Sequence, residues 1–177
     1  MDDLTRLLLA ARDGDRRALG QVVRATQPSI WRLCAHLVGV DDADDATQET
    51  YLAAWRSLPG FRGDSSARTW LFVIARRSAA RVARRRRRWV ELGSAAPSPG
   101  LSPDPGSSGD LDPLLGTLDP ERRLAFVLTQ LFGFSYADAA EVCDCPVGTI
   151  RSRVARARAD LIDAARADAG HRRSDAG

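Results

Sequence analysis

Apolar residues recur every three or four positions through most of the chain, the spacing of helices that bury one face. The pattern covers residues 4–15, 15–39, 41–58 and 66–88, and then residues 121–133, 136–143 and 149–167. No run of alternating apolar and polar residues indicates a strand. Gly14 and Gly39 are expected to stop helices, and Pro28 to break one or start a new one. The chain is therefore predicted to be all-α.

Residues 90–112 depart from this pattern. Four prolines, four glycines and five serines occur among these 23 residues, a composition that cannot build a packed core. We predict a flexible linker here, between two small helical domains at residues 1–89 and 113–166. Residues 167–177 are predicted to form a disordered tail.

The basic residues are unevenly distributed. All 26 are arginine, and residues 1–89 hold 17 of them against 10 acids, a net charge of +7. The linker has four acids and no arginine, and residues 113–177 balance nine of each. Positive charge gathered in one region indicates a polyanionic partner.

The second domain has the pattern of a helix-turn-helix, in which a short helix and a tight turn precede a longer basic helix. On a helical wheel, Ile150, Val154, Ala157 and Leu161 form a stripe to be buried. The opposite side carries Thr149, Ser152 and Arg156, which can reach base edges in a major groove, and Arg151, Arg153 and Arg158 flank it. The alternative is an amphipathic helix whose arginines merely face water.

The helix at residues 66–88 presents a different kind of surface. Its polar sector holds Trp70, Arg77, Arg81 and Arg84, with Arg76 nearby. Arginines that hold a phosphate backbone, combined with an aromatic ring for stacking, are typical of single-strand binding. The alternative is a solvated arginine face with Trp70 packed in the core.

An acidic cluster begins the preceding helix. It consists of Asp41, Asp42, Asp44, Asp45 and Glu49. These acids would repel DNA, so they indicate either a basic protein partner or charges that complement the helix dipole.

The cysteines do not indicate a metal or disulfide framework. Cys143 and Cys145 lack the usual spacing of a zinc site, and Cys34 falls in an apolar helix. We therefore predict no metal and no cofactor. The sequence has neither a signal-peptide pattern nor an apolar run of about 20 residues, so we expect a cytoplasmic protein without membrane insertion.

Two blocks of the sequence resemble a known family. Residues 42–77, DADDATQETYLAAWRSLPGFRGDSSARTWLFVIARR, are similar to the polymerase-binding and promoter-melting segment of bacterial sigma factors of the extracytoplasmic-function (ECF) type. Residues 118–161, LDPERRLAFVLTQLFGFSYADAAEVCDCPVGTIRSRVARARADL, resemble their second DNA-binding domain. The order of the two blocks and the linker between them agree with that family.

The resemblance implies a role for each cluster. Core RNA polymerase would be bound by Asp42, Asp45, Gln48 and Glu49. The −10 element would be read and melted by Arg62, Asp64, Ser65, Trp70, Arg76, Arg77 and Arg81, with Arg84 from the same arginine stripe. The −35 element would be read as duplex by Thr149, Arg151, Ser152, Arg153 and Arg156. Many family members have asparagine at the position of Arg77.

The expected protein is thus a non-enzymatic sigma factor, monomeric when free, that binds core polymerase and promoter DNA. An anti-sigma factor is a further candidate partner. Three alternatives compete with this interpretation: a stand-alone helix-turn-helix regulator, an enzyme, and a helical module that binds polymerase or sigma but not DNA. The first would leave the arginine stripe unexplained, and no convergent nucleophile and base supports the second.

Overall fold

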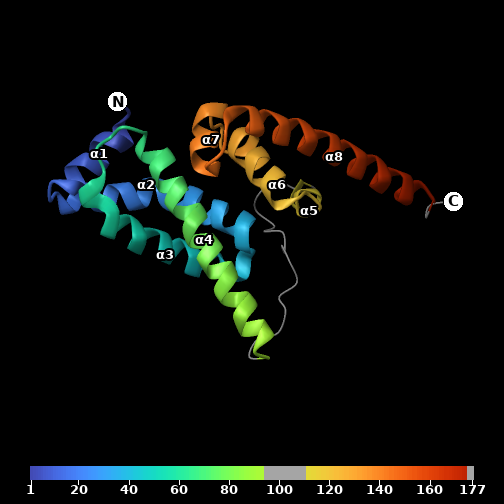
Figure 1. The fold of residues 1–177 in the computed structure, drawn as a ribbon, viewed down its shortest axis with the longest axis horizontal. Coiled ribbons are helices and arrows are strands. Elements are labelled where there is room, and N and C mark those ends of the chain that lie inside the picture. The colour runs from blue at the N-terminus through green and yellow to red at the C-terminus, as the bar shows by residue number, and fades with distance from the viewer. Residues whose placement is uncertain (94–110, 175–177) are drawn as a thin grey trace. The chain divides into compact units, whose positions relative to one another are not determined.

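The computed structural model describes residues 1–93 and 111–174 and divides the chain into two compact units, Met1–Pro99 and Gly100–Gly177 (Figure 1). Every regular element in the described residues is helical, which confirms the all-α prediction. None of these helices is long and apolar enough to cross a membrane.

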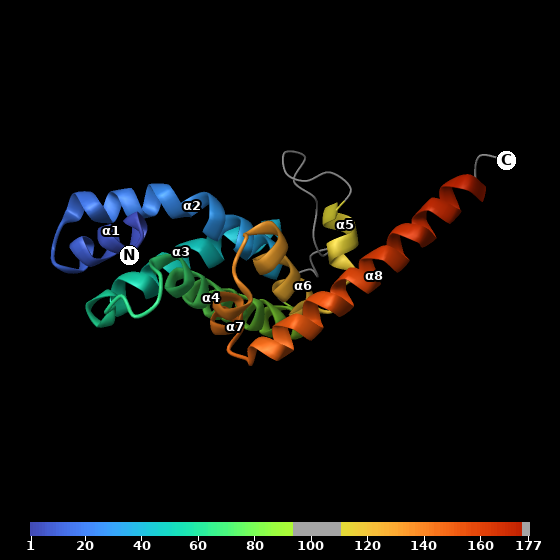
Figure 2. The same ribbon diagram turned by 90° about the horizontal axis from the view of Figure 1, so that it is seen from above.

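The first unit is a bundle of four helices. They are α1 (Asp3–Arg12), α2 (Arg16–Val38), α3 (Val40–Ser57) and α4 (Ala67–Glu91), with a 3-10 turn at Leu58–Gly60. Helices α2, α3 and α4 pack against one another, and α1 lies against α2 and α4 (Figures 1 and 2). Leu8, Ile30, Leu33, Leu71 and Phe72 fill the core and are almost completely buried.

The ends of these helices follow the capping signals in the sequence. Asp15 begins α2 and accepts hydrogen bonds from the backbone of Arg17 and Ala18, and Ser66 begins α4 and accepts one from Thr69. Gly39 ends α2 with φ +87°, a left-handed conformation that glycine adopts without strain.

The prediction that Pro28 breaks or starts a helix was wrong, because α2 runs through it without interruption. A proline inside a helix costs about 3 kcal/mol. Val22, Thr26 and Ile30 on either side of it are buried against the bundle. The burial of this apolar face outweighs the lost backbone hydrogen bond.

The second unit contains α5 (Leu111–Gly116), α6 (Pro120–Phe126), a π-helical turn (Val127–Leu131), α7 (Tyr136–Cys143) and α8 (Val147–Ser174). Asp119 caps α6 and Ser135 caps α7. A three-residue turn at positions 144–146 joins α7 to α8, and Asp144 takes the left-handed conformation there. The predicted helix-turn-helix is confirmed.

The buried stripe of α8 agrees with the helical wheel over most of its length. Ile150, Val154 and Ala157 are at most 1% exposed, whereas Leu161 is only half-buried. Figure 2 shows α8 extending well past the other helices of its unit, and this explains why its stripe loses its cover.

The segments between and after the units differ from the prediction at their edges. Helix α4 continues to Glu91 and α5 begins at Leu111, inside the predicted linker at 90–112, and residues 94–110 lie outside the described residues. Helix α8 continues to Ser174, so residues 167–174 are helical where a disordered tail was expected. Residues 175–177 also lie outside the described part.

Candidate nucleic-acid interface

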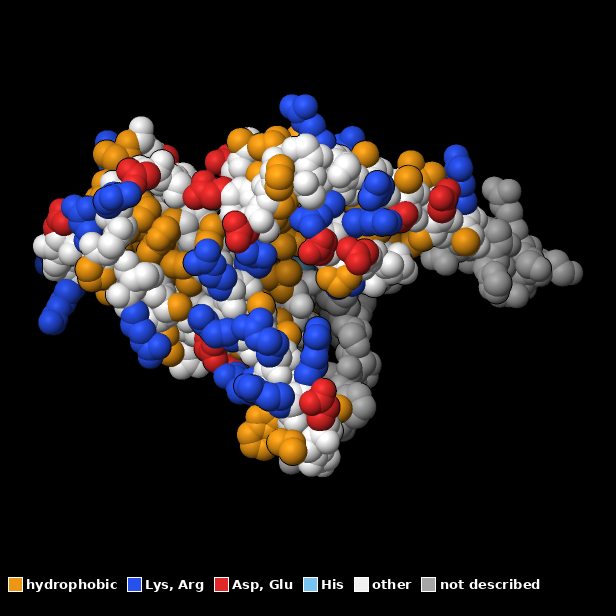
Figure 3. All heavy atoms as spheres, viewed as in Figure 1, with side chains coloured by type: hydrophobic (Ala, Val, Ile, Leu, Met, Phe, Trp, Pro, Cys, Tyr) orange, Lys and Arg blue, Asp and Glu red, His pale blue; other side chains and the backbone are white. Residues whose placement is uncertain are grey.

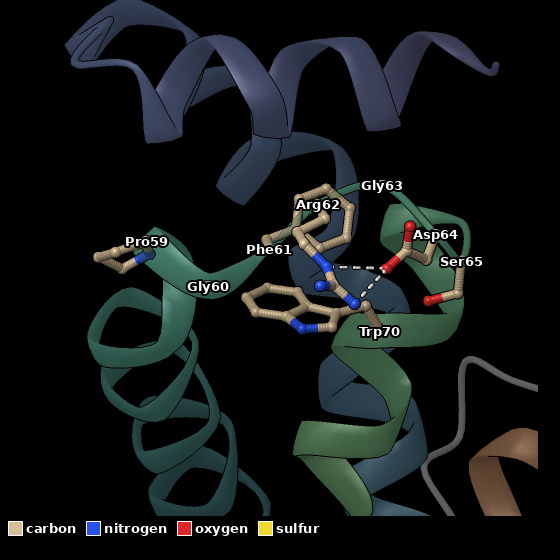
Figure 4. Close-up of a pocket in the computed structure, with 8 residues that line it drawn as sticks. All are labelled: Pro59, Gly60, Phe61, Arg62, Gly63, Asp64, Ser65 and Trp70. Carbon is tan, nitrogen blue, oxygen red and sulfur yellow. Dashed lines mark hydrogen bonds and ion pairs between the residues drawn. The ribbon is translucent and has the colours of Figure 1, made fainter.

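A pocket of about 460 Å³ lies at the turn between α3 and α4. Its lining residues are Pro59, Gly60, Phe61, Arg62, Gly63, Asp64, Ser65 and Trp70 (Figure 4). The rings of Phe61 and Trp70 lie 5.0 Å apart, centroid to centroid, at an angle of 52°. Phe61 is buried and Trp70 is half-buried, so the pair offers part of an aromatic surface to the solvent. The turn thus brings together Arg62, Asp64, Ser65 and Trp70 of the predicted −10 set.

Two polar side chains of this turn are paired with each other. Arg62 donates from Nε to Oδ2 of Asp64 over 3.0 Å, and its Nη2 lies 2.9 Å from the same oxygen. Figure 4 shows Phe61, Arg62 and Trp70 pointing toward one another beside this pair. Both charged groups are more than 70% exposed, so the pair contributes little to stability and is free to exchange partners.

The predicted arginine stripe of α4 is present but uneven. Arg77 and Arg84 are exposed. Arg81 donates to the Ser78 hydroxyl over 2.9 Å, and its Nε lies 3.7 Å from Glu49. Arg76 is half-buried, and among the described residues its Nε has no hydrogen-bond partner.

The last turns of α4 carry both basic and apolar side chains. In Figure 3, blue side chains gather over this part of α4, and orange ones mark its end. Trp89 is 54% exposed and Leu92 is 77% exposed. This end of α4 therefore exposes basic and apolar side chains together.

The acidic cluster of α3 has partners inside the protein, which the sequence interpretation did not foresee. Arg85 binds both Asp45 and Glu49, the latter over 2.5 Å, and Arg86 binds Asp42 over 2.6 Å. Glu49 and Asp42 are only 25% and 20% exposed. The pKa of Arg85 is raised, chiefly by its hydrogen bond to Glu49 and then by the charge of Asp45.

These pairs change the interpretation of the cluster. The acids neutralise part of the run of arginines on α4. They therefore have a structural role, because they join α3 to α4. Gln48 is exposed and Asp45 remains half-exposed, so the surface they share is still accessible. Asp44 accepts a hydrogen bond from the indole of Trp31 over 2.8 Å.

Helix α8, the second helix of the helix-turn-helix, presents most of the predicted −35 residues to solvent. Arg151, Ser152 and Arg156 are exposed, and Thr149 at the start of the helix is half-buried. The Ser152 hydroxyl donates to the Thr149 carbonyl over 2.9 Å.

Arg153 differs from the other predicted −35 residues. Its side chain is 20% exposed and forms an ion pair with Glu121 on α6, and its Nη1 lies 3.5 Å from the Cys145 sulfur. Arg158, one of the flanking arginines, donates to the side chain of Gln130 over 2.8 Å. Arg153 therefore helps to hold α8 against α6, whereas Arg158 remains exposed.

Sequence reasoning missed several residues that shape the pocket. Phe61 forms its aromatic floor, and Arg12 and Thr5 bind the backbone of the turn. Phe61 stands in the same turn as Arg62 and could have been found from its position. Arg12 and Thr5 carry no local signal, because their partners are 49 and 62 residues away.

No group of histidine, cysteine and acidic residues suited to a metal ion occurs within the described ranges. Cys34 is buried, which raises the pKa of its thiol.

Comparison with known proteins assigns both units. Family models of sigma-70 region 2 and sigma-70 region 4 match residues 22–89 and 108–161. The ECF RNA polymerase sigma factor SigC of Mycobacterium tuberculosis is 46% identical over 173 residues, covering 93% of this chain and 92% of its own. This chain belongs to the ECF sigma factors. EcfG of Rhodopseudomonas palustris, another of these factors, is 39% identical over 145 residues, covering 78% of this chain and 80% of its own.

Solved ECF sigma factor structures show the same architecture. RpoE of Bartonella quintana, in complex with the anti-sigma factor NepR, matches with a TM-score of 0.70 and 34% identity over 82% of this chain and 94% of its own. CnrH in complex with the cytosolic domain of CnrY matches with a TM-score of 0.73 and 32% identity over 94% and 99%. This ECF sigma factor is a promoter-specific initiation factor that binds RNA polymerase. Sigma factors are regulatory initiation factors rather than catalysts.

Proposed function

We propose that the turn between α3 and α4 captures an unpaired base of the −10 element, and that this capture drives promoter melting. The observation that carries the proposal is the pocket of about 460 Å³ with the tilted ring pair of Phe61 and Trp70 on one side and Arg62 beside them. Stacking a base on an aromatic side chain is worth about 1–3 kcal/mol. That gain is of the same order as the few kcal/mol needed to extrude a base from the stack.

The other predicted −10 residues of the first unit would contact the DNA backbone beyond the pocket. Arg76, Arg77, Arg81 and Arg84 lie on α4, the helix that begins beside the pocket at Ala67 and carries Trp70 in its first turns. Their guanidinium groups would hold phosphates of the opened strand. Asp64 and Ser65 would accept or donate hydrogen bonds at the edge of the captured base.

The second unit reads the −35 element in this proposal. Arg156, Ser152 and Thr149 would contact base edges in the major groove, and Arg151 would bind a phosphate near the start of α8. Arg153, because of its ion pair with Glu121, would position α8 and reach DNA only at the edge of the contact.

The accessible edge of the acidic cluster is the proposed polymerase-binding surface. Asp45 and Gln48 are the most exposed of the four predicted residues, and Asp42 and Glu49 lie beneath them in ion pairs. A basic polymerase surface would share these acids with Arg85 and Arg86, or displace the two arginines.

The setting of this function is also proposed. The protein would act in the cytoplasm, where RNA polymerase works, as a monomer when free and without catalytic activity of its own. An anti-sigma factor would cover it, as NepR is bound to the similar RpoE. Sedimentation of the free protein would measure the oligomeric state.

The base-capture proposal is tested with Arg62→Ala and Trp70→Ala in holoenzyme. The assay measures the affinity for a forked promoter DNA with an unpaired −10 base. Binding is followed by the fluorescence of 2-aminopurine placed at that base. We expect each variant to weaken binding of the forked DNA by roughly 5-fold or more, since about 1 kcal/mol corresponds to that ratio. Arg17→Ala is the control, because Arg17 is an exposed arginine on α2 outside the pocket. Equal affinities for all four proteins would refute base capture at this turn.

A further inference from the structure

Helix α1 precedes the segment that matches sigma-70 region 2. It nevertheless contacts both ends of the turn between α3 and α4, the base-capture turn. In Figure 4 the α1 ribbon runs alongside the turn that holds Phe61 to Ser65. The residues that make these contacts belong to neither predicted DNA-binding set.

The first contact fixes the aromatic end of the turn. Arg12 donates from Nη1 to the backbone carbonyl of Phe61 over 3.0 Å. The same guanidinium donates from Nε to Oδ1 of Asp13 over 2.8 Å, so it is held from two sides. The Phe61 carbonyl belongs to the residue whose ring lies against Trp70. Arg12 therefore restrains the backbone that aims this ring.

The second contact fixes the end of the turn where α4 begins. The hydroxyl of Thr5 accepts a hydrogen bond from the backbone N–H of Ala67 over 2.9 Å and donates one to Oδ2 of Asp2 over 2.7 Å. Thr5 is only 2% exposed and its bond to Ala67 is buried, whereas Asp2 itself is exposed. Asp2 also accepts from the Thr5 backbone, and these bonds lower the pKa of the Asp2 carboxyl.

Between these two points the turn passes close over α1. Gly63 has φ +80°, and a Cβ built on it would lie 3.7–3.9 Å from the side chains of Leu9 and Thr5, in ordinary contact. A side chain there would be strained by the backbone conformation alone. The turn thus lies against α1 at three positions, Phe61, Gly63 and Ala67.

We propose that Arg12 and Thr5 are positioning residues for base capture: α1 holds the turn in the shape of the pocket before the base arrives. The inference rests on the proposed function of that pocket. A loop ordered in advance loses less conformational freedom on binding, so its affinity is higher. The two contacts made by Arg12 and Thr5 are called the brace. Without the brace, the turn must be ordered by the DNA itself.

The decisive variant is Arg12→Ala in holoenzyme, measured with the same 2-aminopurine forked DNA. One hydrogen bond contributes enough to change the affinity by about 3- to 10-fold. We expect that loss for the forked DNA, with unchanged affinities for core polymerase and for duplex −35 DNA. Arg12→Lys, which can still donate one bond to the Phe61 carbonyl, should recover part of the loss. Arg6→Ala is the matched control, because Arg6 is an exposed arginine of α1 that pairs with Asp3.

A second pair of variants guards against simple unfolding. Thr5→Val removes the hydroxyl at nearly constant shape, and Thr5→Ser keeps it. We expect only the valine variant to weaken capture of the forked base. A merely structural role would instead lower the melting temperature and the polymerase affinity together, and that result would overturn the proposal.

The inference and the proposed function fail in different ways. If Arg62→Ala weakens capture but Arg12→Ala and Thr5→Val do not, the brace is refuted and the pocket stands. If Arg62→Ala and Trp70→Ala have no effect, the pocket itself is refuted, and the brace with it.

Discussion

The ion pair between Asp42 on α3 and Arg86 on α4 allows the structural and the polymerase-binding roles of the acidic cluster to be separated. It joins one acid to one base over 2.6 Å, with 20% and 30% of the two side chains exposed. Asp42→Arg and Arg86→Asp each reverse one charge, and the double variant restores an opposite pair with the charges exchanged. The exchanged pair keeps the contact but removes the acid from the α3 surface.

The magnitude follows from the burial of the pair. Exposed ion pairs contribute about 0.2–1 kcal/mol, and this partly buried pair belongs at the upper end. A single reversal replaces attraction by repulsion of similar size, so it costs about 2 kcal/mol. The double variant places an arginine near the start of α3, which the helix dipole disfavours by about 0.3–1 kcal/mol. We therefore expect it to lie within about 1 kcal/mol of the unaltered protein, a coupling of roughly 3 kcal/mol.

The assay uses a feature of the composition. All four tryptophans, Trp31, Trp55, Trp70 and Trp89, lie in the first unit, so tryptophan fluorescence reports the unfolding of that unit in the full chain. A loss of 2 kcal/mol corresponds to a melting temperature lower by about 8–16 °C in a domain of this size. Co-elution with core polymerase is measured in parallel.

Two results would refute the reasoning. If Asp42→Arg melts like the unaltered protein, the ion pair does not stabilise the bundle. If the double variant is stable and still binds core polymerase with full affinity, Asp42 takes no part in the polymerase surface. We expect a stable double variant whose polymerase affinity falls at least about tenfold.

Further predictions concern the second unit and the thiols. Arg156→Ala should remove about 1–3 kcal/mol of discrimination at one base pair of the −35 element, measured by competition between duplexes; uniform weakening over all sequences would contradict a base contact. Arg151→Ala should weaken binding of every sequence. It should also reduce the slope of log affinity against log salt concentration by about one, as loss of a phosphate contact does; an unchanged slope would argue against a phosphate contact at Arg151. Arg153→Ala should destabilise the second unit by about 1 kcal/mol in calorimetry, since it breaks the pair with α6; an unchanged transition would make Arg153 an ordinary surface residue. Cys34 should resist a thiol reagent at neutral pH until the protein unfolds, because burial raises its pKa and blocks access, while the more exposed Cys145 reacts in the native state; peptide mapping by mass spectrometry would reveal early labelling of Cys34.

The helix boundaries were largely predictable because their signals are local. Ser66, Asp119 and Ser135 each cap a helix within three residues of themselves, so the sequence pattern indicates the bond directly. Pro28 shows the limit of such signals. Its local cost was visible, but the buried face that offsets it depends on three other helices of the bundle.

The candidate site was predictable as a set of residues but not as a set of contacts. A helical wheel gives the direction of Arg85 and Arg86 around their own helix and not the identity of the helix opposite. Their pairing with Asp45 and Asp42 joins residues 40 and 44 positions apart. The same limit hid Arg12, whose carbonyl partner is 49 residues away. Contacts of this range are fixed by tertiary packing alone.

The ion pairs between α3 and α4 have a consequence for the thermodynamics of association with polymerase. Acids that are already neutralised within the protein hold few condensed or nearby counterions. When a basic polymerase surface docks on them, it exchanges one guanidinium partner for another, and the number of charge contacts changes little. The affinity for polymerase should therefore depend on ionic strength less steeply than the five acids at the start of α3 would suggest.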